Sequence, residues 1–461
     1  MSSTDKVNQL FWLAYGQAIK DKAGANFGKT GAFFLASEAQ KGAPAGSAVP
    51  DDYTNTGLYD IANNLLAADN LFYNTSALHG YAEALSTYLN WVDLGSHASK
   101  ALDTALLNAI QDQSAAEIAY QTQRKKAVEQ YKDDCKSGFV PEGQTLTQWI
   151  AAGNAPKLTT ATKNRDAAAA QVIALQDQIA GPLAAQLTND RTKLSQEMNK
   201  NDDIDGFNMH CAVGNVLSPQ ELIRALNNGE TVPKPTFQRL PLYQSAEYKA
   251  AVEAMERKIG TSFKPANSVS FTVDYRKDTS EYNFGQTTAG ACLGVSWAGW
   301  FSFNAGGSFS ESKSIITTAH ETENVSVKVT YDTFQIIPIK LGDWNIDISK
   351  YTLRSDAPKD IKALARVTSL VMATGLGYEI TVGSGVAKTV DNYYNKTVQA
   401  GGSISIFGIP IGVGGSGSST DEKTSHMASW DSEYKTFKVF PAEEAGYATV
   451  VGLMGEKFNI L

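Results

Sequence analysis

The side chains that most often carry chemistry are sparse in this chain, and their spacing completes no catalytic or metal-binding pattern. The segment NDDIDGFNMHCA, residues 201 to 212, places an acidic cluster before His210 and Cys211. Its beginning matches the first half of a calcium-binding loop, but the twelfth position is Ala212, where a bidentate glutamate is required. Neighbouring residues rarely point the same way, so His210 and Cys211 do not read as a nucleophile pair. We therefore predict no metal site and name no catalytic residue.

Two of the five histidines recur at matching places. His320 and His426 each lie in a polar stretch that follows a Gly-Gly-Ser string. Imidazoles gain charge between pH 5 and 8, so a pair of them could form an acid-triggered switch. Two exposed loop histidines without a function are the alternative. We name His320 and His426 as the pH-switch candidates.

The totals exclude several classes of protein. A net charge of -8 over 461 residues argues against nucleic-acid binding, which needs a basic face. No glycine string has the GxxxxGK[ST] phosphate-binding pattern, and we expect no cofactor. The three cysteines, Cys135, Cys211 and Cys292, are widely spaced, which favours reduced thiols in a cytoplasm. No leader sequence and no run of about 18 apolar residues is present, so we expect a cytoplasmic protein or one released without a signal peptide.

The strongest pattern is a repeated pair of glycine-marked, alternating apolar ribbons. The first reads ACLGVSWAGWFSFNAGGS from Ala291 and the second reads GGSISIFGIPIGVGGSGSS from Gly401. The surrounding sequence repeats too, over about 268 to 340 and about 376 to 441, which indicates an internal duplication. The residues on the apolar side of the ribbons are the candidates for membrane contact: Leu293, Val295, Trp297, Trp300, Phe301, Phe303, Ile404, Ile406, Ile409, Ile411 and Val413.

Such ribbons have two interpretations. In a globular fold the apolar side packs on a core, while Gly and Ser on the other side let another backbone approach closely. In a membrane, strands of 9 to 11 residues need the same alternation, because lipid touches one side and water the other. Aromatic residues near both ribbons, such as Tyr393 and Tyr394, could instead line a cavity for an apolar small molecule.

The elements that must position the ribbons are helical before about residue 260 and extended after it. Helical spacing of apolar residues predicts a short helix around Phe11 to Ile19, further helices within 58 to 92, and a long antiparallel hairpin over about 99 to 200 that Pro182 should kink or divide. The segment 355 to 373 also reads as a helix, with Asp356 and Pro358 as start signals.

We therefore predict an α+β protein with two regions. Residues 1 to 260 form a helical domain that ends with a proline-rich linker over about 229 to 241, and residues 261 to 461 form an antiparallel β domain with the internal repeat.

This layout resembles modular pore-forming toxins, which join a helical module to a β module with Gly/Ser-rich amphipathic hairpins. The resemblance implies a membrane-active, oligomerising toxin-like or defence protein with a lipid membrane as partner and a homo-oligomer as its active form. The alternative that the residues leave open is a protein that binds a hydrophobic small molecule, or a cofactor-free enzyme with an aromatic cavity. The sequence favours a protein that is not an enzyme.

Overall fold

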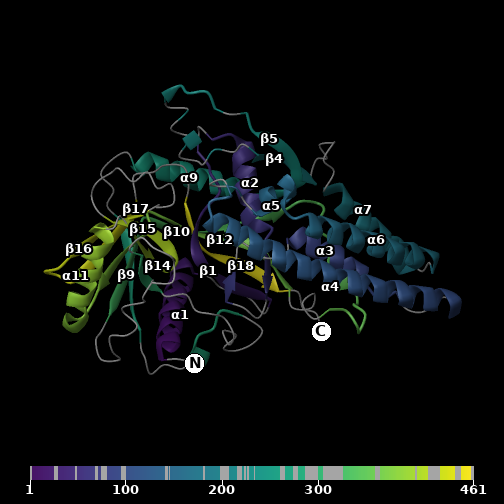
Figure 1. The fold of residues 1–461 in the computed structure, drawn as a ribbon, viewed down its shortest axis with the longest axis horizontal. Helices are drawn as coiled ribbons and strands as arrows, with labels where there is room; N and C mark the ends of the chain where they lie inside the picture. The colour runs from purple at the N-terminus through teal and green to yellow at the C-terminus, as the bar shows by residue number, and fades with distance from the viewer. Residues whose placement is uncertain are drawn as a thin grey trace.

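The computed structural model confirms the α+β class, with most of the helix in the first half of the chain and most of the strand in the second. It describes residues 3–24, 30–46, 49–67, 71–73, 80–94, 100–140, 144, 146–179, 182–197, 207–214, 217, 221–222, 225, 228–232, 234–259, 265–273, 279–285, 300–304, 325–358, 364–399, 402–413, 426–441 and 448–457. Figure 1 shows a β-rich body on one side and long helices that extend from it on the other.

Two large sheets form the body. The six-stranded sheet has the order β10 (Thr333–Pro338), β12 (Leu364–Thr374), β18 (Thr449–Lys457), β1 (Gly31–Lys41) and β3 (Phe72–Tyr73), and β2 (Leu65–Ala67) also pairs with β12. The eight-stranded sheet has the order β7 (Asn267–Thr272), β9 (Ser326–Tyr331), β13 (Gly377–Thr381), β17 (Thr436–Pro441), β16 (His426–Asp431), β15 (Ile409–Val413), β14 (Ser403–Ile406) and β8 (Phe301–Asn304).

The chain passes between the two sheets at two neighbouring corners. β9 leads into β10, and β12 leads into β13, so each strand pair begins in one sheet and ends in the other. The backbone N–H of Asp332 donates to the carbonyl of Thr374 at 2.7 Å and joins the two corners. The two sheets are thereby held together at these corners. The space between them must be filled by another element of the chain.

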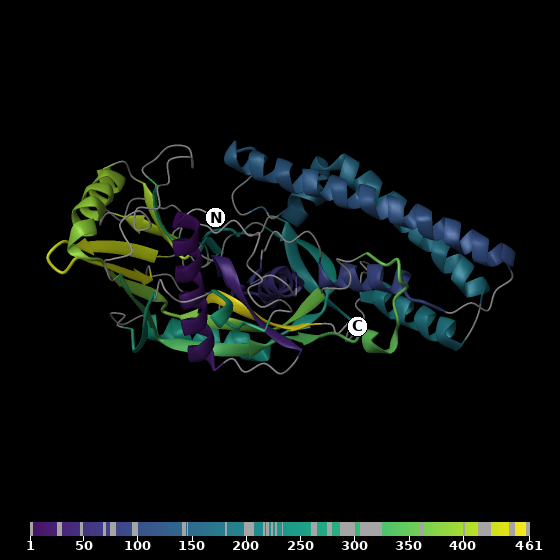
Figure 2. The same cartoon turned by 90° about the horizontal axis from the view of Figure 1, so that it is seen from below.

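The helix α1 (Ser3–Ala23) fills that space, as both views show (Figures 1 and 2). It is longer than the helix predicted around Phe11 to Ile19. Its residues Leu10 to Tyr15 are all buried and share a core with residues of both sheets. We call this cluster the aromatic core.

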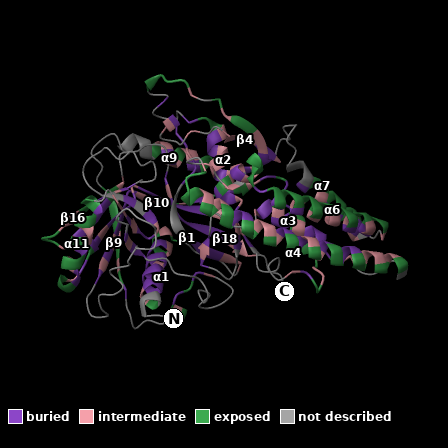
Figure 3. Cartoon of the chain, in the orientation of Figure 1, coloured by how far each residue is buried: buried purple, intermediate pink, exposed green. Residues whose placement is uncertain are grey.

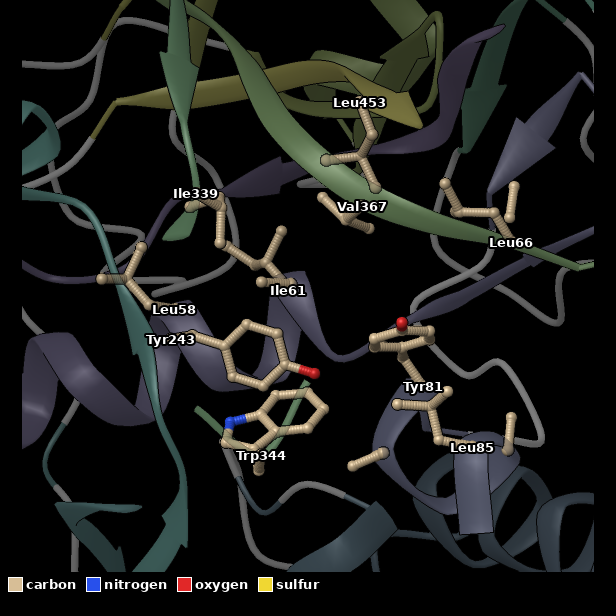
Figure 4. Packing of buried hydrophobic residues seen from close by; sticks show 14 of the residues in the cluster. Leu58, Ile61, Leu66, Tyr81, Leu85, Tyr243, Ile339, Trp344, Val367 and Leu453 are labelled. Carbon is tan, nitrogen blue, oxygen red and sulfur yellow. The ribbon is translucent and has the colours of Figure 1, made fainter. Parts of the chain in front are cut away.

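A second core lies on the opposite face of the six-stranded sheet. There α2 (Asp51–Ala62) and α3 (Tyr81–Asn90) pack with Tyr243 and Trp344 against Val367 and Leu453 (Figure 4). Since both faces of this sheet are buried, its strands appear purple through the centre of the molecule (Figure 3).

α3 also belongs to a group of helices that extends beside the body. We call α3, α4 (Lys100–Lys136), α6 (Pro156–Gln178) and α7 (Pro182–Glu197) the helical arm. α4 and α6 lie side by side along most of their length (Figure 2). The chain turns between them through α5 (Leu146–Trp149) and a π-helical turn (Ile150–Asn154). Pro182 begins α7, so it divides the helical run instead of kinking a continuous helix.

Smaller elements complete the fold. The helix α9 (Ala246–Ile259) packs on β10, and α11 (Ser384–Gln399) packs on β8, β14 and β15. Two short sheets pair β4 (Asn208–Gly214) with β5 (Thr236–Pro241) and β6 (Tyr243–Gln244) with β11 (Lys340–Leu341). Two 3₁₀ turns lie at Thr279–Glu281 and Ile348–Lys350.

Three predicted elements differ from the structure. The predicted helix 355 to 373 is wrong, because most of it is the strand β12, whose two faces are both buried and whose apolar residues therefore do not alternate. The predicted linker 229 to 241 contains β5, which pairs with β4. The region 58 to 92 holds the end of α2 and all of α3, with β2 and β3 between them.

The repeat has a counterpart in the eight-stranded sheet. β7 pairs with β9 in the first copy, β13 pairs with β17 in the second, and the two antiparallel pairs are neighbours through β9 and β13. The duplication itself and the domain boundary near residue 260 stay predictions. β1, from the first region, pairs along β18 at the end of the second.

Candidate functional site

The ribbon residues gather on one face of three adjacent strands. β14 pairs with β15 through Ile404–Ile411 and Ile406–Ile409, as expected of a hairpin. β8, from the first ribbon, lies on the other side of β14 and sets Phe303 against Ile404 and Phe301 against Ile406. The two ribbons are therefore joined edge to edge within one sheet.

Apolar and small residues alternate in the sequence because successive side chains point to opposite faces of the sheet. The six inward side chains are buried: Phe301, Phe303, Ile404, Ile406, Ile409 and Ile411, each no more than 3% exposed. The intervening Ser403 and Ser405 are only partly covered. Over the described part of the ribbons, the apolar side belongs to the core of a single chain.

The hairpin turn itself points into the aromatic core. Phe407 and Gly408 have φ angles of 46° and 75°, the double left-handed geometry of a type I′ turn. Asn-Gly is the usual pair here, because a side chain as large as Phe is strained at positive φ. Phe407 is nevertheless 2% exposed, and its N–H donates to the carbonyl of Trp300 at 2.7 Å. Packing and this hydrogen bond hold the turn in its strained geometry.

Aromatic residues of α1 cover the turn. The Phe407 ring stacks on Tyr15, with centroids 4.1 Å apart, and meets Trp12 edge-on at 5.3 Å. One turn of helix away, Phe11 stacks on Trp300 at 4.0 Å. The first helix, α1, thus contacts both ribbons at their turn ends through stacked pairs of aromatic rings.

Three polar groups are buried among these aromatic rings: the indole N–H of Trp300 and the hydroxyls of Tyr15 and Tyr378. The indole N–H of Trp300 has no acceptor within hydrogen-bonding distance among the described residues. The hydroxyls of Tyr15 and Tyr378 bond to each other at 3.1 Å. Burial raises the pKa of Tyr15 to about 12, against the smaller lowering effect of the bond to Tyr378, and burial also raises the pKa of Tyr378. Neither tyrosine is a base or a nucleophile near neutral pH.

A second helix covers the other end of the ribbons. α11 places Tyr393 against Phe303, with centroids 6.1 Å apart, and Tyr394 against Phe437 of β17 at 5.6 Å. The Trp430 indole of β16 donates to Asp391 of α11 at 3.0 Å. Aromatic side chains that could have lined a cavity pack on one another instead.

Some predicted site residues lie outside the described residues: Leu293, Val295, Trp297 and His320. Val413 ends β15, and only its backbone position is described.

His426 is not an exposed loop residue. It lies in β16, is 2% exposed, and its Nε2 is 2.6 Å from the carbonyl of Leu376, which makes Nε2–H the donor. The predicted pH-switch pair stays a prediction, because His320 lies outside the described residues.

Sequence reasoning missed a polar pair beside the body. Asp51 and Asp52 begin α2, and Asp52 Oδ1 is 2.7 Å from Nδ1 of the half-exposed His210. Cys211, the next residue in β4, is fully buried, and burial raises its pKa to about 12. His210 and Cys211 point to opposite faces of the strand, as expected. Only the fold could reveal Asp52 as the partner, since 158 residues separate the two.

The described residues contain no group of three or more His, Cys, Asp and Glu side chains that could hold a metal ion. Among the described helices, none has an apolar stretch long enough to cross a bilayer. Two hollows border the sheets, one of about 460 Å³ between α1 and β7 and one of about 530 Å³ between α9 and β10. Neither is lined by the ribbon residues.

Comparison of the chain with family models, curated proteins and solved structures finds no match.

Proposed function

We propose that this is a membrane-active, oligomerising protein of the toxin or defence type, in which α1 and α11 keep the ribbons covered until they are released at a membrane. The observation that carries the proposal is the buried, left-handed Phe407 turn stacked on Tyr15. Strained residues persist only where their surroundings hold them, and they concentrate at sites that change conformation.

In the folded structure, two features near the ribbon turns are unfavourable in free energy. A non-glycine residue at positive φ costs about 1 to 3 kcal/mol. An unsatisfied buried donor such as the Trp300 N–H costs about 1 to 3 kcal/mol more. At a membrane interface an indole places its ring among acyl chains and its N–H among polar headgroups, so release would remove the second cost.

α1, one of the two covering helices, is a single element near the start of the chain. It contacts Trp300 and Phe407 through aromatic rings. Such apolar contacts do not require one particular partner, so lipid could replace them. At its end, Lys20 donates to the carbonyl of Asn283 at 2.7 Å. α1 could therefore leave without breaking a backbone strand pairing.

Strands inserted in lipid must pair at every edge, because lipid offers no partners for backbone groups. A single ribbon pair cannot meet this requirement, so the proposal includes a homo-oligomer. The alternative of an apolar ligand site is less supported, because Phe301, Phe303 and Tyr393 fill the space between the ribbons and α11 themselves.

The test is release of a trapped dye from liposomes between pH 5 and 7.5, with electron microscopy of the treated liposomes. We expect release together with ring-like oligomers, and we expect Val413→Lys to abolish release while the protein stays folded. Intact liposomes at every pH and lipid composition, or a Val413→Lys variant that releases dye normally, would contradict the proposal.

A further inference from the structure

His210 is held in one orientation by its neighbours. Its Nδ1 lies 2.7 Å from Oδ1 of Asp52, in the first turn of α2. Its ring stacks on Phe237 of β5, with centroids 4.5 Å apart and planes 21° from parallel. Asn55 of α2 donates to the backbone carbonyl of His210 at 2.9 Å. Because α2 packs beside β4 (Figure 1), the backbone, the ring face and Nδ1 of His210 are all fixed.

These contacts leave the Nε2 atom of His210 available for reaction. A carboxylate only accepts hydrogen bonds, so the Nδ1–H of His210 donates to Asp52. The neutral imidazole then carries its lone pair on Nε2, on the side of the ring away from Asp52. The side chain is half-exposed, and among the described residues Nε2 has no hydrogen-bond partner. Cys211 is buried on the opposite face of the strand and takes no part.

A positive side chain lies on the same face of the strand pair. Arg239 of β5 is directly opposite His210 in the antiparallel register. Directly opposed residues point to the same face, with Cβ atoms about 5 Å apart. The neighbouring carboxylate of Asp51 pairs with Lys249 at 2.6 Å, so its charge is compensated. A reactive nitrogen beside a guanidinium group suits an electrophile with negative charge, and guanidinium groups bind phosphate oxygens well.

We propose that His210 is a phosphoryl acceptor, modified on Nε2 by a donor with a labile P–N bond. The Nε2 lone pair forms a bond to phosphorus, while the P–N bond of the donor breaks and the donor nitrogen leaves with the electron pair. With phosphoramidate the leaving group is ammonia, and no proton moves, because the donor nitrogen is already protonated. The ring becomes an imidazolium, which the Asp52 carboxylate stabilises, and the charge of Arg239 favours the new phosphoryl oxygens.

The proposed acceptor is separate from the ribbons. β4 and β5 form a two-stranded sheet of their own, and His210 does not belong to the aromatic core. The modification therefore does not rest on membrane activity, and its experiments use no lipid, so either proposal can fail without the other.

The first test compares the folded and the unfolded chain. The wild-type protein is incubated with phosphoramidate, with and without urea, and mass spectrometry follows phosphoryl groups that acid removes and alkali does not. In urea the five histidines should react alike. In the folded protein His210 should react about tenfold faster than in urea, while the buried His426 should not react. A folded His210 that reacts no faster than the unfolded one would overturn the proposal and leave an ordinary surface histidine.

Two adjacent carboxylates separate activation of His210 from folding. Asp52→Asn keeps the size of the side chain but removes the charge that stabilises the imidazolium, so we expect His210 to react about tenfold more slowly. Asp51→Asn is the matched control, because Asp51 pairs with Lys249 instead of His210, and its rate should equal that of the wild type. Arg239→Gln should slow the reaction by a smaller factor.

All rates are measured at a temperature where thermal melting shows each variant to be folded. A purely structural Asp52 would lower the thermal midpoint and leave the rate at His210 unchanged. Equal rates for Asp52→Asn and the wild type, or an equal slowing by Asp51→Asn, would therefore contradict the proposal.

Discussion

The aromatic core and the helical arm are held together by different forces. In the aromatic core, α1 meets both ribbons through stacked rings, with Phe11 on Trp300 and Tyr15 on Phe407. In the arm, the central contact is ionic. Glu83 of α3 receives hydrogen bonds from Arg124 and Tyr120 of α4 and from Arg165 of α6.

The contacts of the arm are directional. Arg165 lies 2.7 Å from Glu83 and also over the ring of Tyr120, with its guanidinium carbon 4.1 Å from the ring centroid. Three helices meet at one carboxylate, which fixes their relative positions as only charged, oriented groups can. Elsewhere in the arm, Asp190 of α7 accepts from the Tyr351 hydroxyl at 2.7 Å and from Lys350 at 2.6 Å.

The difference indicates which part of the molecule can move. Ring packing is non-directional, and lipid can replace it at little cost. A half-buried carboxylate between two largely buried guanidinium groups has no comparable substitute, because separation would take its charge away from both of them. We therefore propose that the release of the ribbons, if it occurs, takes place in the aromatic core, while the arm keeps its geometry.

The largest loss of stability should come from Phe407→Ala. Removing a buried Phe typically costs 3 to 5 kcal/mol, so we expect about 4 kcal/mol, with the left-handed φ retained by Ala. Chemical denaturation measures it. Phe407→Gly should be less destabilised, because Gly adopts positive φ freely. Equal stabilities of the two variants would show that the turn is not strained.

A smaller loss is expected for Glu83→Gln. The change removes the carboxylate that two largely buried guanidinium groups share, although Arg165 keeps its pair with the exposed Asp166. We expect a cost of about 3 kcal/mol in the free energy of unfolding. Asp133→Asn is the matched control, because its pair with Lys136 is exposed on both sides and should contribute nothing measurable. Equal losses of stability for Glu83→Gln and Asp133→Asn would show that the ionic contact at Glu83 does not hold the arm together.

Because of Glu83, we expect the stability of the protein to depend on pH in the acid range. Burial alone would raise the pKa of Glu83, but Arg124, Arg165 and the bond from Tyr120 outweigh it and lower the pKa to about 2. A depressed carboxyl pKa adds stability that is present above the unfolded pKa and is lost as pH falls through the folded one. Stability should fall between about pH 4.5 and pH 2 in the wild type.

The Glu83→Gln variant lacks this titration. Its denaturation midpoints over the same acid range should fall less steeply than those of the wild type. Parallel pH curves for the two proteins would mean that Glu83 is not the group that titrates.

The smallest effect is expected for Tyr15→Phe. It removes the bond to Tyr378 and leaves one buried hydroxyl without its partner, at a cost of about 1 to 2 kcal/mol. The double variant with Tyr378→Phe should regain part of that loss, because neither hydroxyl remains unpaired. Additive losses in the double-mutant cycle would show that the two hydroxyls do not interact.

Sequence patterns predicted the parts of the fold that have one buried face. The alternation around Ile404 and Ile406 predicts the β14–β15 hairpin, and the apolar spacing over 99 to 200 predicts α4, α6 and α7 of the arm. Strands with two buried faces show no such alternation, so the pattern does not predict them. In β1, Phe33 faces the aromatic core and Phe34 the second core, so no alternation is left to see.

The site was predicted only in part for a related reason. The pattern identifies which ribbon residues are apolar, but not what covers them. Tyr15 lies 363 residues from Tyr378 and nearly 400 from Phe407, and no local signal connects them. The left-handed φ of Phe407 is also hidden, since the sequence Phe-Gly resembles an ordinary glycine break.

The most direct test compares the rate of liposome dye release for Phe407→Leu and Glu83→Gln at a temperature where both are folded. Leu keeps the site apolar but loses the stack on Tyr15, and a barrier lower by about 1.4 kcal/mol would speed release about tenfold. The account predicts this increase for Phe407→Leu and the wild-type rate for Glu83→Gln, although the latter loses more stability. Rates that rise with lost stability in both variants, or in neither, would contradict the assignment of movement to the aromatic core.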